Sequence, residues 1–378
     1  MGGGLRRAAV PPSNTAPSGD PQATAMPNPA TMIDLRSDVK SQPTPAMRKA
    51  MAEAVVGDDA AGEDPTVAEL ERRAAEITGK QAAVFVTSGT QGNLVALLSL
   101  TRPGEEMIAD EKAHLIHYEG GGCTRIAGLL PRLLPCRQGC LEPGEVAKAI
   151  SKGSTVRGRT GVVVMENTHN LAGGVAVAPE RLRAVAEVAW EAGARVHLDG
   201  ARIFNAAVAL GQPVADFTRW CDTVTFCFSK SLGAPAGSVV CGDAEVIEQA
   251  RAHRRMLGGA MRQAGHLAAA ALVALDTMVE RLADDHRHAR QIAETLATLP
   301  GVEIDLTLVQ TNMVFFQLRR EDISPEQFIE AMRRRGILIS GTEPKQGYFR
   351  LVTHHNIDDA ATQMVCEAFR ETLGVAGC

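Results

Sequence analysis

The stretch Asp-Thr-Val-Thr-Phe-Cys-Phe-Ser-Lys (222–230) runs directly into Ser-Leu-Gly-Ala-Pro-Ala-Gly (231–237). Its β-branched and aromatic residues predict a buried strand, and the glycines and proline that follow predict a loop. A lysine at this junction, Lys230, would have apolar residues on the strand side and access to solvent on the loop side. Burial of that kind disfavours the ammonium form and leaves a nucleophilic amine that can form an imine. The position alone does not distinguish this chemistry from a solvated cap.

Strand and helix patterns alternate on both sides of this stretch, which predicts an α/β fold with a mostly parallel sheet. After residue 265 a long helical stretch and short strands predict a smaller α+β carboxy-terminal domain. The predicted helices are Pro43–Val55, Pro65–Thr78, Leu94–Leu100, Pro179–Glu191, a helical stretch over Gly265–Leu299, Pro325–Arg335 and Asp358–Leu373. The predicted strands are Gln81–Val86, Gly161–Glu166, Ala194–Asp199, Asp222–Lys230, Ser238–Cys241, Val302–Leu306, Thr311–Leu318, Gly336–Ser340 and Tyr348–Val352.

The predicted organisation has three parts: a flexible tail at residues 1–31, a large domain at 32–280 and a small domain at 281–378. The tail is rich in Gly, Pro, Ala and Ser and lacks the compact apolar core of a secretory signal. An organelle transit peptide is the alternative interpretation of this tail. Within the large domain, residues 32–60 are expected to pack partly on the small domain or on a partner subunit.

Charge and cysteine usage argue against several classes of partner. The 378 residues carry a net charge of −5, which predicts no nucleic-acid partner. No apolar run approaches the length of a membrane span. The eight cysteines include no CxxC pair and no Cys/His set at zinc spacing, so no metal site is predicted. Their scatter through apolar segments favours a reducing compartment, the cytoplasm.

The turn Thr87-Ser88-Gly89-Thr90 lies between a predicted strand and a predicted helix. Backbone N–H groups at the start of a helix are unsatisfied, and the helix dipole favours an anion there. Gly89 allows close approach, while Ser88 and Thr90 add hydroxyl donors. An ordinary helix N-cap explains the same residues, and by itself that explanation is preferred.

A carboxylate follows at the end of another strand. Asp199 closes Ala194–Asp199, and ligands of open α/β sheets bind outside the carboxyl ends of strands. An Asp there can pair with a protonated pyridine nitrogen, and Arg202 can reach the same crevice to bind a carboxylate. A structural Asp–Arg turn is the alternative. Together, Lys230, Asp199 and the Ser-Gly-Thr turn are the parts that a pyridoxal 5′-phosphate site needs.

Motifs spread over Met32–Leu373 resemble the L-threonine aldolase family, whose members are fold-type I pyridoxal-phosphate enzymes. The long and ordered set is far more specific than any one motif. It consists of Leu35-Arg-Ser-Asp, Gly57-Asp-Asp, Gly62-Glu-Asp-Pro-Thr, Ser88-Gly-Thr-Gln-Gly-Asn, Glu166-Asn-Thr-His-Asn, His197-Leu-Asp-Gly-Ala-Arg-Ile-Phe-Asn, Phe228-Ser-Lys, Met261-Arg-Gln-Ala-Gly and Phe349-Arg-Leu-Val-Thr-His.

The resemblance implies a role for each matching position. Lys230 matches the lysine that holds the cofactor, and Asp199 matches the partner of its pyridine nitrogen. The resemblance also implies retro-aldol cleavage of L-threonine, L-allo-threonine or related L-β-hydroxy-α-amino acids to glycine and an aldehyde. The other matches are Ser88, Gly89 and Thr90 at the cofactor phosphate, His114 against the cofactor ring, His169 near the substrate hydroxyl, and Arg202, Ser37 and Arg350 at the substrate carboxylate.

Such cleavage needs a base for the β-hydroxyl proton, and a histidine suits that role at neutral pH. The sequence does not decide between His114, His169 and a relaying water, and pure stacking is an alternative role for His114. Arg262 resembles a residue that reaches the cofactor phosphate of a neighbouring subunit. A homodimer with shared sites is therefore expected, and a tetramer of such subunits.

Departures from the family pattern concern the pocket more than the cofactor. A tyrosine commonly precedes the Gly-Glu-Asp-Pro segment, where this chain has Ala61. Ala260 and Ser231 replace family glycines. A wider pocket at Ala61 would also admit aromatic substrates such as phenylserine. Alternatives on the same scaffold are β-elimination, transaldolase or aminotransferase chemistry, and a non-catalytic binding protein is the alternative of another class.

Overall fold

The computed structural model describes residues 32–343 and 346–374, so the tail at 1–31 lies outside the described residues. Its main feature is a seven-stranded sheet with the order β2-β10-β9-β8-β7-β3-β4. All neighbours in it run parallel except β10, which is antiparallel to both β2 and β9. The strands are β2 (Ala82–Val86), β3 (Glu106–Asp110), β4 (Leu130–Leu134), β7 (Thr160–Glu166), β8 (Arg195–Asp199), β9 (Thr223–Cys227) and β10 (Ser238–Gly242).

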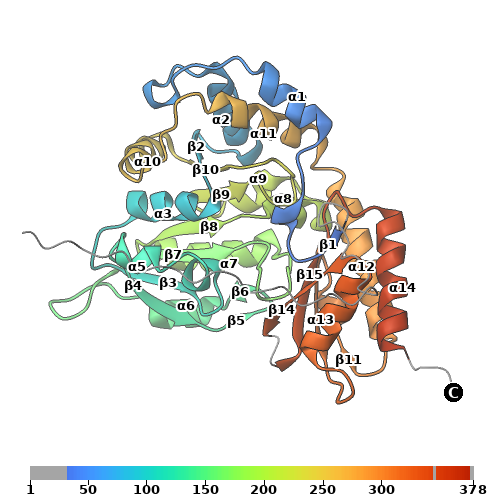
Figure 1. Ribbon diagram of the computed structural model, residues 1–378. Coiled ribbons are helices and arrows are strands. Elements are labelled where there is room, and N and C mark those ends of the chain that lie inside the picture. Colours follow the sequence, from blue (N-terminus) through green and yellow to red (C-terminus); the bar gives the residue numbers. More distant parts are fainter. Residues whose placement is uncertain (1–31, 344–345, 375–378) are drawn as a thin grey trace, which may run out of the picture.

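Both faces of this sheet are buried along its inner strands, as their almost continuous apolar residues require, whereas the edge strand β4 is largely exposed. Successive residues of β7 show the alternation, since Val163 packs in one hydrophobic cluster and Val162 and Val164 pack in another. Helices α2 (Pro65–Thr78), α7 (Pro179–Glu191), α8 (Ile203–Leu210), α9 (Val214–Thr218) and α11 (Gly265–Thr277) contribute to the first cluster, whereas α3 (Gly89–Leu100) and α10 (Ala244–Met256) cover the opposite face. In Figure 1, α2 and α11 lie at the top of the large unit.

A second unit is built around an antiparallel sheet with the order β11-β12-β15-β14. Figure 1 shows it in orange and red beside the large sheet. Its core contains apolar residues from Ala289 onward together with one early residue, Leu35. Its elements are β11 (Val302–Glu303), β12 (Met313–Leu318), β14 (Ser340–Glu343), β15 (Tyr348–Val352), α12 (Leu282–Ala297), α13 (Pro325–Arg334) and α14 (Asp359–Leu373).

The amino-terminal segment is held against this second unit. Strand β1 (Ile33–Asp34) pairs in parallel with β13 (Ile337–Leu338). The backbone of Leu35 then donates to Leu338 O at 2.9 Å and accepts from Val352 N–H at 2.9 Å. The bonds bring the residues just after β1 to the junction between the two sheets. The division into domains at residue 281 stays a prediction, because α12 begins in the first cluster with Leu282 and continues in the second.

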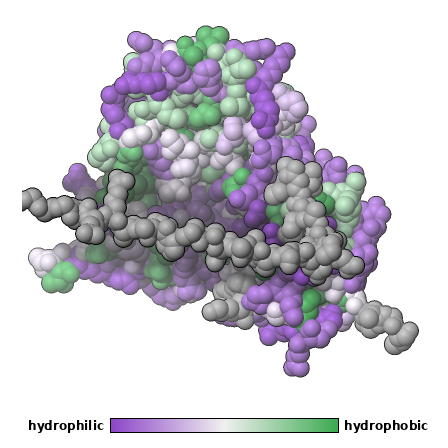
Figure 2. Space-filling model, viewed as in Figure 1, coloured by the Kyte–Doolittle hydropathy of each residue, from purple (hydrophilic) through white to green (hydrophobic). Residues whose placement is uncertain are grey.

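The remaining elements are short connections. They are α1 (Pro45–Glu53), α4 (His114–His117), α5 (Gly122–Arg125), β5 (Cys136–Arg137), β6 (Cys140–Leu141), α6 (Pro143–Ala149) and the 3₁₀ turns η2 (Asp38–Lys40), η3 (Asp59–Ala61) and η4 (Leu306–Leu308). The seven cysteines among the described residues are free, and all but Cys136 are buried. No helix within the described ranges combines the length and apolarity that crossing a membrane would need. The visible surface is mostly hydrophilic, with scattered apolar residues (Figure 2).

Several predicted boundaries are wrong. The strand before Lys230 ends at Cys227, so the lysine lies three residues into the loop. The helix expected from Leu94 begins at Gly89, because the glycine-rich turn is itself the first helical turn. The stretch predicted as helical over 265–299 is two helices separated at residues 278–281. Strands β3 and β4 and helix α10 were not predicted at all.

Candidate active site

Three adjacent parallel strands, β3, β7 and β8, each end in a buried acid: Asp110, Glu166 and Asp199. Glu166 and Asp199 are register partners across β7 and β8. Lys230 follows the next strand, β9, and is partly exposed. The carboxyl ends of parallel strands share one edge of the sheet, so these groups converge where such sheets bind ligands.

Asp199 is 3% exposed and is held by two hydrogen bonds. Asn93 donates to its Oδ2 at 2.8 Å, and the backbone N–H of Ala201 donates to its Oδ1 at 3.1 Å. Burial acts to raise the pKa of this carboxyl, but the charge of Lys230 and the neighbouring His114 outweigh it and the pKa is lowered. No Lys, Arg or His nitrogen lies within 4 Å of it among the described residues, so an ionised carboxylate faces the site without a cation bound to it.

Glu166 organises the loops on either side of the site. Its carboxylate accepts the backbone N–H of His114 and the backbone N–H of Asn170, each at 2.8 Å. His197 lies behind Asp199, with Nδ1 2.9 Å from Thr223 Oγ1 and Nε2 3.1 Å from Asn93 Oδ1. Burial lowers the pKa of His197 to about 4, so this ring is neutral and acts as packing and hydrogen-bonding support.

His114 begins α4 and lies partly open, with 26% of its side chain exposed. Its Nδ1 is 2.8 Å from Oε1 of Glu119, whose side chain is 6% exposed. The ring lies 5.3 Å from the exposed ring of Tyr118. Beyond Tyr118 opens a cavity of about 1000 Å³ between the two sheets, which Leu171 and Tyr348 also line.

His169 has a different environment, since only 1% of its side chain is exposed. Its Nδ1 accepts the backbone N–H of Ala172 at 3.2 Å, and its Nε2 lies 3.6 Å from Asp110 Oδ1. Burial acts to lower the pKa of this imidazole, but Glu166 and Asp110 outweigh it and the pKa is raised. Cys136 lies beside the pair, and burial together with Asp110 raises the pKa of its thiol to about 12.

Two groups of side chains have ligand atoms within 4.8 Å of one another, the arrangement that a metal ion needs: Asp110 with Cys136 and His169, and His114 with Glu119 and Asp199. The hydrogen bond to His169 opposes metal binding in the first group. A neutral ring whose Nδ1 accepts a hydrogen bond carries its own proton on Nε2, the nitrogen that would face the metal. The second group coincides with the proposed cofactor site.

The anion-binding turn is the start of α3. Ser88 caps this helix, since its Oγ accepts the backbone N–H of Gln91 at 3.2 Å. The backbone N–H groups of Gly89 and Thr90 have no acceptor among the described residues. A Cβ on Gly89 would lie 2.8 Å from the sulfur of Cys227, so glycine also lets α3 pack directly against β9. Two free N–H donors at a helix start are suited to binding an anion, as expected from the sequence.

Arg202 is committed to Asp38 by a buried bidentate ion pair, with Nε–Oδ2 2.6 Å and Nη2–Oδ1 2.7 Å. Ser231 donates to the same carboxylate at 2.8 Å, so the serine that replaces a family glycine strengthens the anchor. Burial acts to raise the pKa of Asp38, but Arg202 and Lys230 outweigh it and lower the pKa far below its ordinary value. Ser37, next to Asp38, caps the turn η2 by accepting Val39 N–H at 3.4 Å.

Arg350 projects from β15 toward the same place. Its Nη1 donates to Asn170 Oδ1 at 2.9 Å and its Nη2 to the backbone oxygen of Arg36 at 3.3 Å, while its buried Nε has no partner. Burial, and then the neighbouring charge of Arg202, lower the pKa of Arg350. Arg350 therefore lies near a second guanidinium with no carboxylate partner of its own among the described residues, and the surplus positive charge suits a bound carboxylate.

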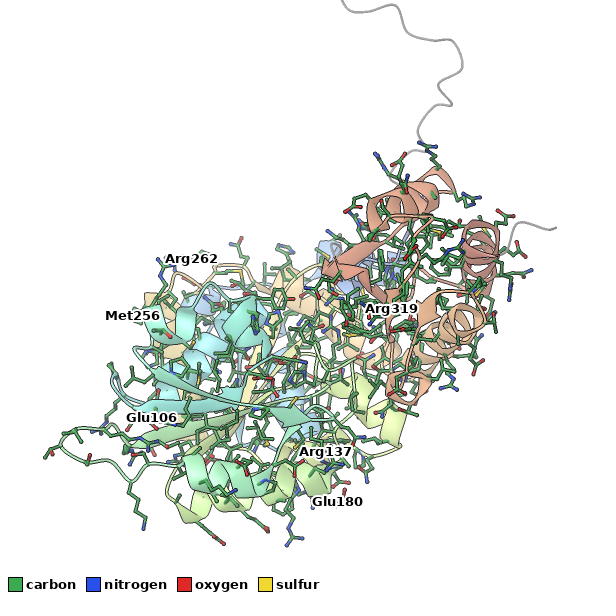
Figure 3. The ribbon with its side chains drawn as sticks, turned by 90° about the horizontal axis from the view of Figure 1, so that it is seen from below. Glu106, Arg137, Glu180, Met256, Arg262 and Arg319 are labelled. Carbon is green, nitrogen blue, oxygen red and sulfur yellow. The ribbon has the colours of Figure 1, made fainter. Side chains whose placement is uncertain are left out.

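Arg262 lies elsewhere, 74% exposed and paired with Asp58 at 2.9 Å. Figure 3 shows it near Met256 at the edge of the large unit, far from Arg319 in the second unit. Ala61 and Ala260 line a separate surface cavity of about 550 Å³, whose lining does not include Lys230 or His114. The position of Ala61 therefore does not support the expected widening of this chain's own substrate pocket.

Sequence analysis assigned no role to the acids that organise the site, Asp38, Asp110, Glu119 and Glu166. Asp110 and Glu166 could have been found by one signal, a carboxylate at the end of a buried strand, which is the rule that identified Asp199. Glu119 offers no such signal, because it follows a short helix and is buried only through tertiary contacts with Asn93 and His114.

A lysine after a strand, an ionised carboxylate at the end of the adjacent strand and a free helix start are the arrangement expected of the fold-type I pyridoxal-phosphate class. The threonine aldolase of Leishmania major has this fold with a TM-score of 0.77 at 21% identity, over 90% of this chain and 99% of that one.

The chain belongs to the beta-eliminating lyase family, whose model matches residues 34–319. It is 41% identical over 343 residues to the low specificity L-threonine aldolase of Escherichia coli (strain K12), covering 90% of this chain and 99% of that protein. It is 39% identical over 347 residues to the low-specificity L-threonine aldolase 1 of Arabidopsis thaliana, covering 90% and 96%. The protein is thus a pyridoxal-phosphate-dependent lyase.

Proposed function

We propose that this lyase cleaves L-threonine, L-allo-threonine and related L-β-hydroxy-α-amino acids to glycine and an aldehyde. The observation that carries the proposal is the convergence of Asp199, Lys230 and the two free N–H groups of α3 at one edge of the sheet. The relatives named threonine aldolases, at about 40% identity over nine-tenths of the chain, support the choice of reaction.

The residues present fit pyridoxal 5′-phosphate. The N–H groups of Gly89 and Thr90 would bind its phosphate, with Ser88 and the Thr90 hydroxyl beside them. Asp199 would pair with its pyridine nitrogen, which explains a buried carboxylate that keeps a low pKa with no cation bound to it. Lys230 would hold it covalently through its amine, and His114 would lie against its ring. When bound, the cofactor supplies the electron sink for the bond broken at Cα.

The remaining residues would act on the substrate. Arg350, whose Nε has no partner, would bind the substrate carboxylate, with Arg202 held beside it by Asp38 and with Ser37 nearby. A histidine, His114 or His169, would take the proton from the β-hydroxyl as the Cα–Cβ bond breaks. The closed packing around Asp199 would exclude water from the pyridine side of the site.

We also propose that the active unit is at least a dimer, and a tetramer of two such dimers. The exposed position of Arg262, at an edge of the large unit, supports a role in the site of a neighbouring subunit. Light scattering of the purified protein tests the subunit number, and a monomer at working concentration would overturn this part of the proposal.

The experiment for the reaction is to incubate the purified, cofactor-loaded protein with L-threonine. We expect acetaldehyde and glycine in equal amounts, and loss of both products together with the visible absorbance of the bound cofactor in Lys230→Ala. Ammonia with a keto acid would instead show β-elimination. Absence of any product from L-threonine, L-allo-threonine and phenylserine would indicate a non-catalytic binding protein.

A further inference from the structure

The two histidines of the site present different nitrogens to it. His114 has Nδ1 2.8 Å from the Glu119 carboxylate, while its Nε2 has no hydrogen-bond partner among the described residues and is not buried. His169 has Nδ1 occupied by the Ala172 N–H, and its buried Nε2 faces Asp110. Only His114 has an unoccupied nitrogen on the open side.

A base needs a lone pair that the substrate can reach. An imidazole that donates its Nδ1 proton to a carboxylate keeps its lone pair on Nε2. In His169 the accepting nitrogen is already bonded to a backbone N–H, so the proton of the neutral ring lies on Nε2, toward Asp110. His169 would have to lose both the hydrogen bond from the Ala172 N–H and the contact of Nε2 with Asp110 before it could accept a substrate proton.

We propose that Glu119 is a positioning residue, which holds His114 in the tautomer with Nδ1 protonated so that Nε2 accepts the β-hydroxyl proton. This inference rests on the proposed retro-aldol reaction. The hydroxyl O–H bond breaks and an Nε2–H bond forms. The released O–H electron pair makes the aldehyde C=O as the Cα–Cβ bond breaks, and the electron pair of that bond stays with Cα.

The side-chain amide of Asn93 holds the Glu119 carboxylate in place. Its Nδ2 donates to Glu119 Oε1 and to Asp199 Oδ2, both at 2.8 Å, and its Oδ1 faces Nε2 of His197 at 3.1 Å. The side chain of Glu119 is 6% exposed, so its carboxylate has little freedom to leave His114. One amide thereby links the residue proposed to pair with the cofactor and the residue that orients the base.

Nitrogen-15 NMR of the cofactor-loaded protein, labelled at histidine, tests the tautomer without any measurement of activity. The His114 signals are assigned by their loss in His114→Ala. We expect the proton of the neutral His114 ring on Nδ1 in the native protein, and a shift toward the Nε2-protonated form in Glu119→Ala. A ring that carries the proton on Nε2 in the native protein, or that is unchanged in Glu119→Ala, would overturn the proposal.

Kinetics provide the second readout. In Glu119→Ala we expect kcat to fall by roughly 10²-fold, the lower end of what a positioned acid or base contributes, with the cofactor absorbance and KM nearly unchanged. Glu119→Gln keeps an acceptor oxygen for Nδ1–H, so it should recover most of the loss. Glu145→Ala, an exposed glutamate of α6, is the matched control and should behave as the native protein.

A double-mutant cycle separates positioning from an independent effect. Because Glu119 acts through His114, the variant with both replaced by alanine should be no slower than His114→Ala alone. A full additional loss from Glu119→Ala in that background would overturn the proposal. If the native protein releases no aldehyde, the proposed reaction has failed, while the NMR result still decides the role of Glu119.

Discussion

At the level of single residues, the charged side chains of the site are unequally paired, since some have an oppositely charged partner and others have none. Asp38 is shared by Arg202 and Ser231, which leaves Arg350 near a second guanidinium with no carboxylate of its own. A buried cation without an anion is costly. We therefore expect Arg350 to gain its partner only when a substrate carboxylate binds, which makes it a specificity residue for α-amino acids.

Arg350→Lys tests this assignment. Lysine keeps the charge but loses the planar fork, so at least one charged hydrogen bond to the carboxylate is lost. A bond of that kind contributes about 1.5–3 kcal/mol, and we expect KM for L-threonine to rise roughly ten- to a hundredfold. Steady-state kinetics at fixed pH measure the change, with Arg334→Lys on the exposed side of α13 as control. A fall in kcat at unchanged KM would contradict the assignment.

At the level of elements, α3 carries two functions at its first turn. The N-cap of Ser88 starts the helix, the N–H groups of Gly89 and Thr90 remain free for an anion, and Gly89 lets the helix touch Cys227 of β9. The same glycine therefore sets the position of the anion site relative to the strand that leads to Lys230.

Gly89→Ala should disturb both functions. Its Cβ would lie 2.8 Å from the Cys227 sulfur, so α3 must shift or the cysteine must repack. We expect the free energy of unfolding to fall by about 1–3 kcal/mol, and the cofactor to be lost more readily on dialysis. Gly144→Ala in α6, where a Cβ meets nothing within 4 Å, is the matched control and should be neutral or slightly stabilising. Unchanged cofactor retention in Gly89→Ala would show that the helix start does not hold the phosphate.

Elements with local signals could be predicted from the sequence. Helix α2 has both its ends as expected, because Asp64 caps it before Pro65 and Gly79 ends it with φ +62°. Strand β15 likewise matches its prediction at both ends. The break between α11 and α12 has no local signal, because it contains neither Gly nor Pro. Strand β3 has none either, because it has an acid at each end, which in the sequence suggests an exposed segment.

The site residues also divide into those with a local signal in the sequence and those without one. Asp199 has a signal in the sequence because it ends a strand, and its resemblance to a known motif adds to that signal. Some of the pairs that orient the site join residues far apart in the chain, as Asp38 and Arg202 do. Such pairs depend on how β1 and the following turn return to the junction of the two sheets, which no local pattern encodes.

At the scale of the whole molecule, stability should depend on pH through one buried and two partly buried histidines that are neutral in the folded protein. Burial lowers the pKa values of His197, His286 and His355 to about 4, against an ordinary value of 6.5. Between pH 6.5 and 4 the unfolded chain binds protons at these positions and the folded chain does not. The free energy of unfolding therefore falls as the pH falls. Above pH 6.5 their contribution is constant.

Denaturant unfolding at steps from pH 7.5 to pH 4.5 measures this slope. We expect the free energy of unfolding to decrease steadily below pH 6.5, and the decrease to be shallower in His286→Gln, which removes one of the three groups. Asp38, whose pKa is lowered, gives a loss of the same sign only at lower pH, as the carboxyl of the unfolded chain becomes protonated. An identical slope in His286→Gln would show that this ring titrates normally in the folded protein.

Sharing of sites between subunits can be tested by mixing two inactive variants. Lys230→Ala would remove from its own site the lysine proposed to hold the cofactor, and Arg262→Ala would remove a proposed phosphate contact from the neighbour's site. In a hybrid dimer both lesions fall on one site, and the other site is complete. Half of randomly assorted dimers are hybrids with one complete site of two, so refolding an equal mixture should recover about a quarter of native activity. If Arg262 served its own chain, each site of a hybrid would carry one lesion and no activity would return.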